Sequence, residues 1–264
     1  PRALSSLKYF YENAPQYHIV CAGSLLGIAL HQGTSFPVGK VDFLKLYPLS
    51  FKEFLMATDK ERFAELLDKR DFQMITSFKQ TYIDALKHYY FVGGMPEAVA
   101  AFIESHNLQE SREILTALYD NYLSDMELYQ ASRESILRSR ALFQNIYNEL
   151  NKESKNFSPG IIEKNSKTRD FISPLQWLTM TNIVNQSFQL KEHITTPLMV
   201  NNSSNFRLFL GDIGMFSYQS GINATSFISK NSGNTLSGIF FENFVANELT
   251  AKGHKLFYWK GKNT

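Results

Sequence analysis

Residues 18–55, HIVCAGSLLGIALHQGTSFPVGKVDFLKLYPLSFKEFL, carry the strongest indication of the fold. Residues 18–22 form a short apolar run with an Ile-Val pair, which predicts a buried β-strand. A Gly-Ser step at Ser24 follows this strand, and a Gly-Lys pair ends at Lys40. Ligands gather at the carboxyl ends of strands in a parallel α/β sheet, so the Ser24 hydroxyl is placed to meet one. The alternative is that Ser24 caps a following helix.

The rest of this stretch predicts a strand and then helices. Residues 42–47 include alternating apolar and polar side chains, as a strand with one buried face does. Ser50 and Glu53 form an S-x-x-E capping box, which predicts that a helix begins there. From residue 60 to about 150 the pattern is helical, which predicts a lid or bundle of antiparallel helices. Its breaks are at residues 93–96, 106–107 and 131–132.

The pattern after residue 150 mixes short helices with strands. Residues 151–156 are polar and predict a domain boundary. Two helices followed by a β-hairpin suit a winged helix, with Phe171 and Trp177 in its core. The predicted helices are at 159–165, 168–181, 211–220 and 236–252, and the predicted strands at 183–190, 206–210 and 254–259, with a hairpin turn at 201–205. On helix 236–252 we expect one apolar face, made of Ile239, Phe240, Phe244, Val245 and Leu249.

Composition indicates a packed, ordered protein. With 264 residues, of which 44% are hydrophobic, the chain can form one large domain or two to three small ones. The net charge of +2 implies no partner by itself. Residues 1–150 hold 15 Lys and Arg against 18 Asp and Glu, whereas residues 151–264 hold 12 against 7. A basic second half is typical of nucleic-acid contact.

The cysteine count and the hydropathy pattern bear on the compartment. Cys21 is the single cysteine, which excludes an intrachain disulfide and fits a reducing compartment, so we expect a cytoplasmic protein. We expect Cys21 to be a buried core residue. No apolar stretch reaches the ~18 residues that a membrane span needs, so we expect no membrane partner.

The order of the motifs resembles a known family. In this order the chain resembles the prokaryotic AAA-plus superfamily ATPases whose C-terminal half is a domain of unknown function, with a winged helix and a restriction-endonuclease-like core. The resemblance covers nearly the whole chain. Its motifs are Leu46-Tyr47-Pro48-Leu49-Ser50, Gly93-Gly94-Met95-Pro96, Lys155-x-Phe157, Leu175-x-Trp177-Leu178, Leu208-x-Leu210-x-Asp212-x-Gly214, Gly238-x-x-x-Glu242-Asn243-x-Val245-x-x-Glu248 and Tyr258-Trp259.

The resemblance implies a mainly α fold with α/β parts. It implies late strands of an AAA-plus core in 1–58, a helical lid in 59–130, a winged helix in 131–210 and the beginning of a nuclease-like domain in 211–264. The family's phosphate loop and acidic strand end would precede Pro1, and its further nuclease acids would follow Trp259. We therefore expect both ends to be cut ends within a longer protein.

The resemblance implies that the family uses ATP and Mg²⁺. It makes Ser24 and Lys40 candidates for sensing a nucleotide. The family has Arg where this chain has Lys40, and Lys lacks the bidentate fork of Arg, so a solvated loop lysine is the alternative. The sequence contains no G-x-x-x-x-G-K-[ST] loop. We therefore assign no catalytic residue, and we expect neither ATP hydrolysis nor tight binding of ATP or Mg²⁺ by this chain alone.

Basic residues before and within the predicted winged helix are candidates for nucleic-acid contact. Lys155, Lys164, Lys167 and Arg169 could lie along the phosphates of double-stranded DNA, or form a solvated surface. Glu242 matches a nuclease-like acid, but the other acids of that set are missing from this chain, so we predict that it is inactive. The six histidines show no pairing typical of a metal site, and we predict none.

Two functions remain open at this point. The first is a segment of an ATP-binding AAA-plus ATPase that works by nucleotide-driven conformational change, with DNA contact and a homo-oligomeric state as further expectations. The alternative is a non-enzymatic DNA-binding or adaptor module built on a winged helix. An active nuclease is disfavoured by its incomplete set of acids. Whether the chain is itself an enzyme stays open.

Overall fold

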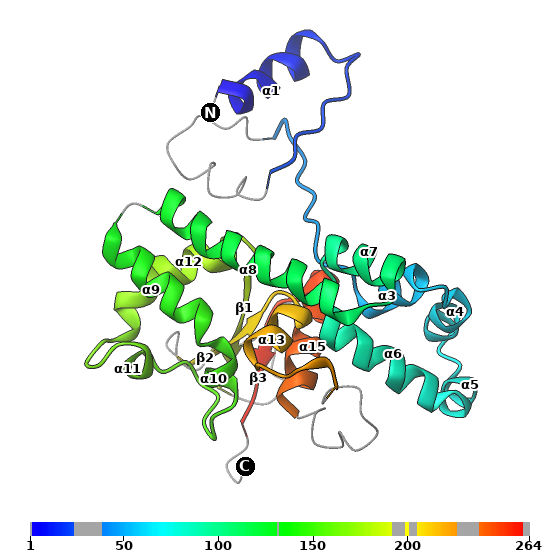
Figure 1. Ribbon diagram of the computed structural model, residues 1–264. Helices are drawn as coiled ribbons and strands as arrows, with labels where there is room; N and C mark the ends of the chain where they lie inside the picture. The colour runs from blue at the N-terminus through cyan, green and yellow to red at the C-terminus, as the bar shows by residue number, and fades with distance from the viewer. Residues whose placement is uncertain are drawn as a thin grey trace.

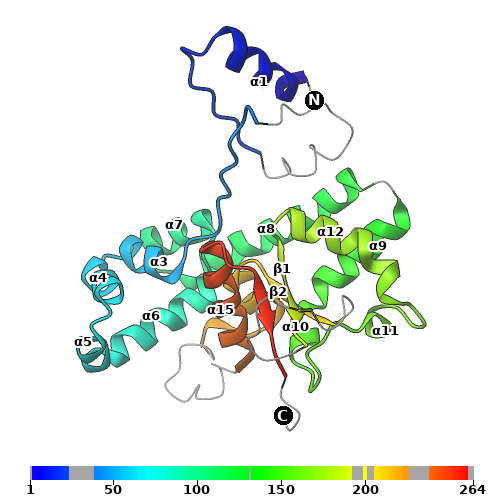
Figure 2. The same cartoon turned by 180° about the vertical axis from the view of Figure 1, so that it is seen from behind.

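The computed structural model describes residues 2–23, 39–130, 132–191, 199–200, 205–225 and 238–260. Helix α1 (Arg2–Asn13) lies apart from a helical body and is linked to it through an extended segment at residues 41–47 (Figure 1). The body packs helices around one small sheet, as the view from behind also shows (Figure 2). The described part is thus mainly helical, as predicted. None of its helices has both the length and the apolarity required to cross a membrane.

The two strands predicted near the N-terminus are not formed. Residues 18–22 and 42–47 have no regular structure, and Val20 and Leu44 are 93% and 86% exposed. The prediction that Cys21 is buried is wrong as well, because it is exposed. A strand needs a neighbouring strand for its N–H and C=O groups. The described residues place no such neighbour beside either segment.

The helices from residue 51 to 150 follow the predicted pattern. Helix α3 (Phe51–Ala57) begins at the predicted capping box: Ser50 Oγ accepts from the Glu53 N–H, and Glu53 Oε2 accepts from the Ser50 N–H at 2.7 Å. All three predicted breaks separate helices. The following helices are α4 (Glu61–Lys69), α5 (Phe72–Ser77), α6 (Lys79–Val92), α7 (Pro96–Ser105), α8 (Leu108–Tyr129), α9 (Arg133–Gln144) and α10 (Ile146–Leu150).

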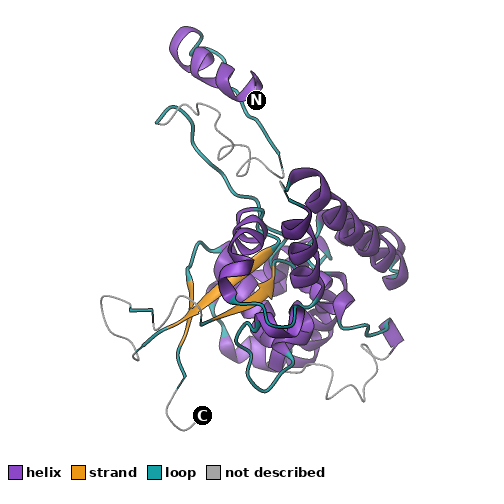
Figure 3. Cartoon of the chain, turned by 90° about the vertical axis from the view of Figure 1, so that its left-hand side faces the viewer, coloured by secondary structure: helices purple, strands orange, loops and turns teal. Residues whose placement is uncertain are grey.

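The second half carries a mixed sheet of three described strands (Figure 3). Strand β1 (Val184–Gln189) pairs antiparallel with β2 (Phe206–Leu210), which confirms that the two predicted strands pair. Strand β3 (Leu256–Tyr258) pairs parallel with β1, so the order is β2-β1-β3. The turn predicted at 201–205 is misplaced, because Val200 already forms an antiparallel bridge with Leu190; residues 201–204 themselves lie outside the described residues. The helices here are α11 (Pro159–Ile162), η1 (Thr168–Phe171), α12 (Ile172–Met180), α13 (Ile213–Gln219) and α15 (Gly238–Ala251).

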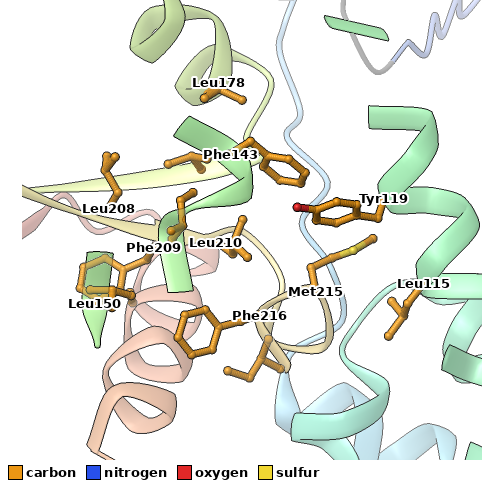
Figure 4. Close-up of a cluster of buried hydrophobic side chains, with 14 of the residues drawn as sticks. Leu115, Tyr119, Phe143, Leu150, Leu178, Leu208, Phe209, Leu210, Met215 and Phe216 are labelled. Carbon is orange, nitrogen blue, oxygen red and sulfur yellow. The ribbon is translucent and has the colours of Figure 1, made fainter. Parts of the chain in front are cut away.

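One hydrophobic core joins most of these elements. Tyr119 of α8 and Phe143 of α9 meet residues of β2 and α13, such as Leu210 and Met215 (Figure 4). Phe171 and Trp177 are buried, as predicted. The core contains side chains from both sides of residues 130 and 210. The domain boundaries at those two positions stay predictions, and the packing is continuous across them.

Candidate functional site at the Asp212 junction

Asp212 lies between β2 and α13 and is 2% exposed. Its Oδ1 accepts a hydrogen bond from the Met215 N–H at 2.9 Å, so it caps the N-terminus of α13. Its Oδ2 accepts from the Gly94 N–H at 2.7 Å, in the corner between α6 and α7. One buried carboxylate therefore holds two distant segments of backbone together.

Glycines allow this close approach. A Cβ atom on Gly93 would lie 2.4 Å from Asp212 Oδ1, and Gly93 also has a φ of +79°. A Cβ on Gly94 would lie 2.2 Å from the Leu49 carbonyl oxygen, and one on Gly214 would lie 2.6 Å from the Val92 carbonyl oxygen. The sequence predicted a corner at residues 93–96, and the structure shows why it needs two glycines.

The chain that enters the body is fixed at the same corner. The Leu49 N–H donates to the Gly94 carbonyl at 2.7 Å, and the Tyr89 hydroxyl donates to the Leu49 carbonyl at 2.7 Å. Two residues later, the Phe51 N–H donates to Glu248 Oε1 of α15 at 2.8 Å. We call this set the Asp212 junction. It consists of Leu49, Phe51, Tyr89, Gly93, Gly94, Asp212, Gly214 and Glu248.

Asn243 ties α15 to the strand that precedes Asp212. It is fully buried, accepts from the Leu210 N–H at 2.9 Å and donates to the Leu210 carbonyl at 3.1 Å. This corrects the predicted apolar face of α15. Ile239 and Phe240 are buried, but Val245 and Leu249 are 46% and 40% exposed, because α15 turns Asn243 toward β2.

Burial controls the electrostatics of the junction. It raises the pKa of Asp212 above its ordinary value, although the backbone donors act in the opposite direction. Burial also raises the pKa of Glu248, against the hydrogen bond from the Phe51 N–H. The pKa of Tyr89 is raised well above its ordinary value, first by burial and then by the nearby acids. Asp212, Glu248 and Tyr89 each have a specific hydrogen-bond partner in the backbone.

The recess beside these residues is too small for a substrate. It has a volume of about 10 Å³, room for about one water molecule. Tyr47, Pro48, Asn185 and Asn247 contribute to its wall. Ser50 also lines it, and the Ser50 hydroxyl donates to Glu53 Oε2 at 2.8 Å. The hydrogen bonds of the junction tie together backbone segments that lie far apart in the chain.

Glu242 belongs to a separate surface cluster. It forms ion pairs with Lys155 and with Arg207, the second at 3.4 Å. The Arg207 guanidinium lies 4.2 Å from the ring centre of Tyr258, whose hydroxyl donates to Asn156 Oδ1 at 2.6 Å. The carboxylate that matched a nuclease acid is thus paired with two positively charged side chains. Within the described residues, no three metal-ligating side chains gather at one place.

The other predicted site residues are dispersed. Lys40 Nζ lies 2.7 Å from Glu12 Oε1, and the hydrogen bond from Lys40 is the main cause of the lowered pKa of Glu12. Ser24 lies outside the described residues. Lys164 and Lys167 are exposed, and Arg169 lies 3.8 Å from Asp170. Among the predicted site residues that the structure describes, only Lys155 and Glu242 are brought together from separate elements.

Sequence reasoning did not single out Asp212, Asn243 or Glu248 as site residues. A signal existed for Asp212, since an aspartate just before a helix is a typical N-cap. Asn243 carried another signal, because it is a polar residue beside the expected apolar face of α15. Glu248 belongs to a motif of the resemblance, but nothing in the sequence indicated its partner Phe51, which is nearly two hundred positions away in the chain.

Comparison with known proteins defines the family. Residues 1–55 match a family described as AAA domain. Searches of curated proteins and of solved structures found no match. Residues 83–226 match a family described as Domain of unknown function (DUF8612). This second match spans more than half of the chain and includes the glycine corner and Asp212, and the chain therefore belongs to the family with that domain of unknown function.

Proposed function

We propose that this chain passes a nucleotide-dependent movement of an AAA-type domain to a helical body, through the Asp212 junction. Two observations support the proposal. Residues 1–55 match the AAA domain, and the end of that match is bonded into the junction. The observation that carries it is Leu49, whose N–H and C=O groups are both held by residues of the α6–α7 region.

The two sides of Leu49 differ in their contacts. Residues 41–47 are extended and mostly exposed, with Leu44 and Leu46 more than four-fifths exposed. From Leu49 onward the backbone is bonded to α6, to the glycine corner and to α15. We therefore expect a movement upstream of the junction to reach the packed body through the hydrogen bonds at Leu49.

A pair of spin labels tests the coupling. In a Cys21→Ser background, cysteines replace Leu46 and Glu104, both of which are exposed. We expect a narrow distance distribution that broadens in Leu49→Pro, because proline cannot donate to the Gly94 carbonyl. The matched control is Leu44→Pro, upstream of the labels, which should leave the distribution narrow. A broad distribution in the parent chain would refute the proposal. Equal distributions in Leu49→Pro and Leu44→Pro would refute it as well.

Nucleotide chemistry is a separate part of the proposal. ATP and Mg²⁺ would act on the AAA-type domain, with a phosphate loop that the 264 residues do not contain. Phosphate release by the purified chain should therefore equal the buffer background. Turnover above background that disappears on Lys40→Ala would show that this chain hydrolyses ATP and that Lys40 takes part.

A second candidate function is contact with double-stranded DNA. Lys164 and Lys167 are exposed on the segment between α11 and η1, whereas Lys155 is paired with Glu242. We expect Lys164→Glu with Lys167→Glu to lower the salt concentration at which a duplex is released. The control, Lys79→Glu with Lys252→Glu, has the same charge change elsewhere on the surface. Equal release by both variants would exclude this segment as the DNA contact.

A further inference from the structure

Helices α7 and α8 form a hairpin at the edge of the body (Figure 1), and residues of both line a groove. Its volume is about 420 Å³, far larger than that of the recess at the Asp212 junction. Its apolar lining, which we call the floor, consists of Ala101 from α7 and Ile114, Ala117 and Leu118 from α8; Asn121 of α8 also lines it. The core-facing side of α8 is different, since Leu115 is fully buried. Ala117 is exposed, whereas Ile114 and Leu118 are partly buried and also pack against the core, so the groove lies at the border between the core-facing and solvent-facing sides of α8.

The groove is strongly acidic at its rim. Glu97 of α7 and Glu110 and Glu113 of α8 line it, and all three are exposed. They form no ion pair with any cation of the described residues. Asn107 donates to Glu110 at 3.2 Å, which leaves the charge of Glu110 uncompensated.

The rest of the hairpin reinforces this charge. Residues 96–129 contain seven acidic residues and one Lys or Arg, which is Arg112. Arg112 is turned inward: its guanidinium lies 3.9 Å from the ring centre of Phe91 and donates to Ser217 Oγ at 3.1 Å. The hairpin therefore presents negative charge to solvent without an internal counter-charge near the groove.

We propose that this groove binds a cationic amphipathic helix of a partner protein. Ile114, Ala117 and Leu118 have the i, i+3 and i+4 spacing that receives aliphatic side chains of a second helix. The small side chains of Ala101 and Ala117 allow its backbone to approach. Glutamates on both walls require Lys or Arg on both flanks of the bound helix. The same charge repels nucleic acid, so this surface is distinct from the proposed DNA contact.

A designed peptide serves as the probe. It is a fluorescein-labelled helix of about four turns with leucines on one face and lysines on both flanks. Fluorescence anisotropy should show saturable binding to the full chain, weakened by salt but not abolished, because the apolar floor is not screened. A peptide of the same composition in scrambled order should bind less tightly.

Matched charge reversals test the location. The groove variant combines Glu97→Lys, Glu110→Lys and Glu113→Lys. The control combines Glu104→Lys, Asp120→Lys and Glu153→Lys, which are exposed acids that do not line the groove. We expect the groove variant to lose at least about tenfold more affinity than the control, as three modest ion pairs together predict. Ala117→Arg, which fills the floor, should weaken binding as well.

Several results would overturn the inference. One is the absence of saturable binding, and another is an equal loss in both triple variants, which would mean unspecific charge attraction. Equal binding of the scrambled peptide would show that the apolar floor plays no part. If sedimentation shows a dimer that only the groove variant dissociates, a second copy of this chain occupies the groove, and the proposal of a different partner is wrong. The spin-label test at Leu49 is unaffected by any of these outcomes.

Discussion

Asp212 and Glu242 are two acidic residues from neighbouring motifs, and their surroundings differ in every respect. Asp212 is 2% exposed and accepts hydrogen bonds from two backbone N–H groups. The Glu242 side chain is 33% exposed and pairs with two cationic side chains. Backbone donors are placed by the fold itself, whereas cationic side chains are mobile and exchange with water. The buried Asp212 therefore holds segments of the backbone together, whereas Glu242 forms ion pairs near the surface.

The two acids also differ in what they contribute to stability. The sequence matched Glu242 to a nuclease-like acid that we predict to be inactive, and the structure places it in a partly exposed ion-pair cluster. An exposed ion pair contributes about 0–1 kcal/mol, whereas leaving a buried polar group unsatisfied costs about 1–3 kcal/mol. The junction is thus the more sensitive of the two places, and four predictions test that difference.

The largest effect is expected at Gly94. In Gly94→Ala, the new Cβ would lie 2.2 Å from the Leu49 carbonyl oxygen, and backbone on both sides must shift. We expect the free energy of unfolding to fall by about 3 kcal/mol or more. Urea denaturation measures this. Gly160→Ala is the matched control, since no atom lies within 4 Å of its new Cβ. Equal losses in both variants would contradict the tight approach.

Asp212→Asn should have the next largest effect. Asparagine keeps the shape, but its amide group must face one of the two N–H donors, from Gly94 or Met215, with a donor of its own. We expect a loss of about 1–3 kcal/mol in the free energy of unfolding. If Asp212→Asn unfolds at the same urea concentration as the parent chain, the two hydrogen bonds to the carboxylate do not contribute to stability, and the description of the junction is wrong.

The pH dependence should distinguish the two acids further. The pKa of Asp212 is raised in the folded state, above its ordinary value of 3.8. The folded state then takes up a proton before the unfolded state does, so this group stabilises the fold increasingly as pH falls from neutral through its folded pKa. The gain in stability is complete below the unfolded pKa.

The measurement is the difference in unfolding free energy between the parent chain and Asp212→Asn. This difference should grow on acidification from neutral pH toward 3.8, by at most about 1.4 kcal/mol per pH unit. Subtraction removes the contribution of Glu163, whose pKa is lowered by Arg138 and whose stabilising effect is lost in acid. A difference that shrinks on acidification would mean that the pKa of Asp212 is lowered.

The smallest effect is expected at Glu242. Glu242→Gln removes the charge that pairs with Lys155 and Arg207 but keeps the side-chain shape. We expect a loss of less than about 1 kcal/mol in the free energy of unfolding, and a smaller loss at high salt. A double-mutant cycle with Lys155→Met isolates the pair. A loss as large as that of Asp212→Asn would remove the distinction between the two sites.

Local signals explain why much of the fold was predictable. The capping box at Ser50 and the corner at residues 93–96 each depend on neighbours within a few positions. The failed predictions depend on partners that lie elsewhere. Residues 18–22 have the pattern of a strand, but no described strand lies beside them. Val245 has an apolar side chain on α15, but Asn243 sets the rotation of that helix.

Local signals were enough to predict the helical breaks and the capped start of α3, because turn and cap signals act over short distances. The position of the candidate site depends on the packed fold. The Asp212 junction joins Leu49, Gly94, Asp212 and Glu248, which lie far apart in the chain. Their hydrogen bonds form only once the core has brought these segments together. The sequence around a buried carboxylate does not indicate which distant backbone N–H group will bind it.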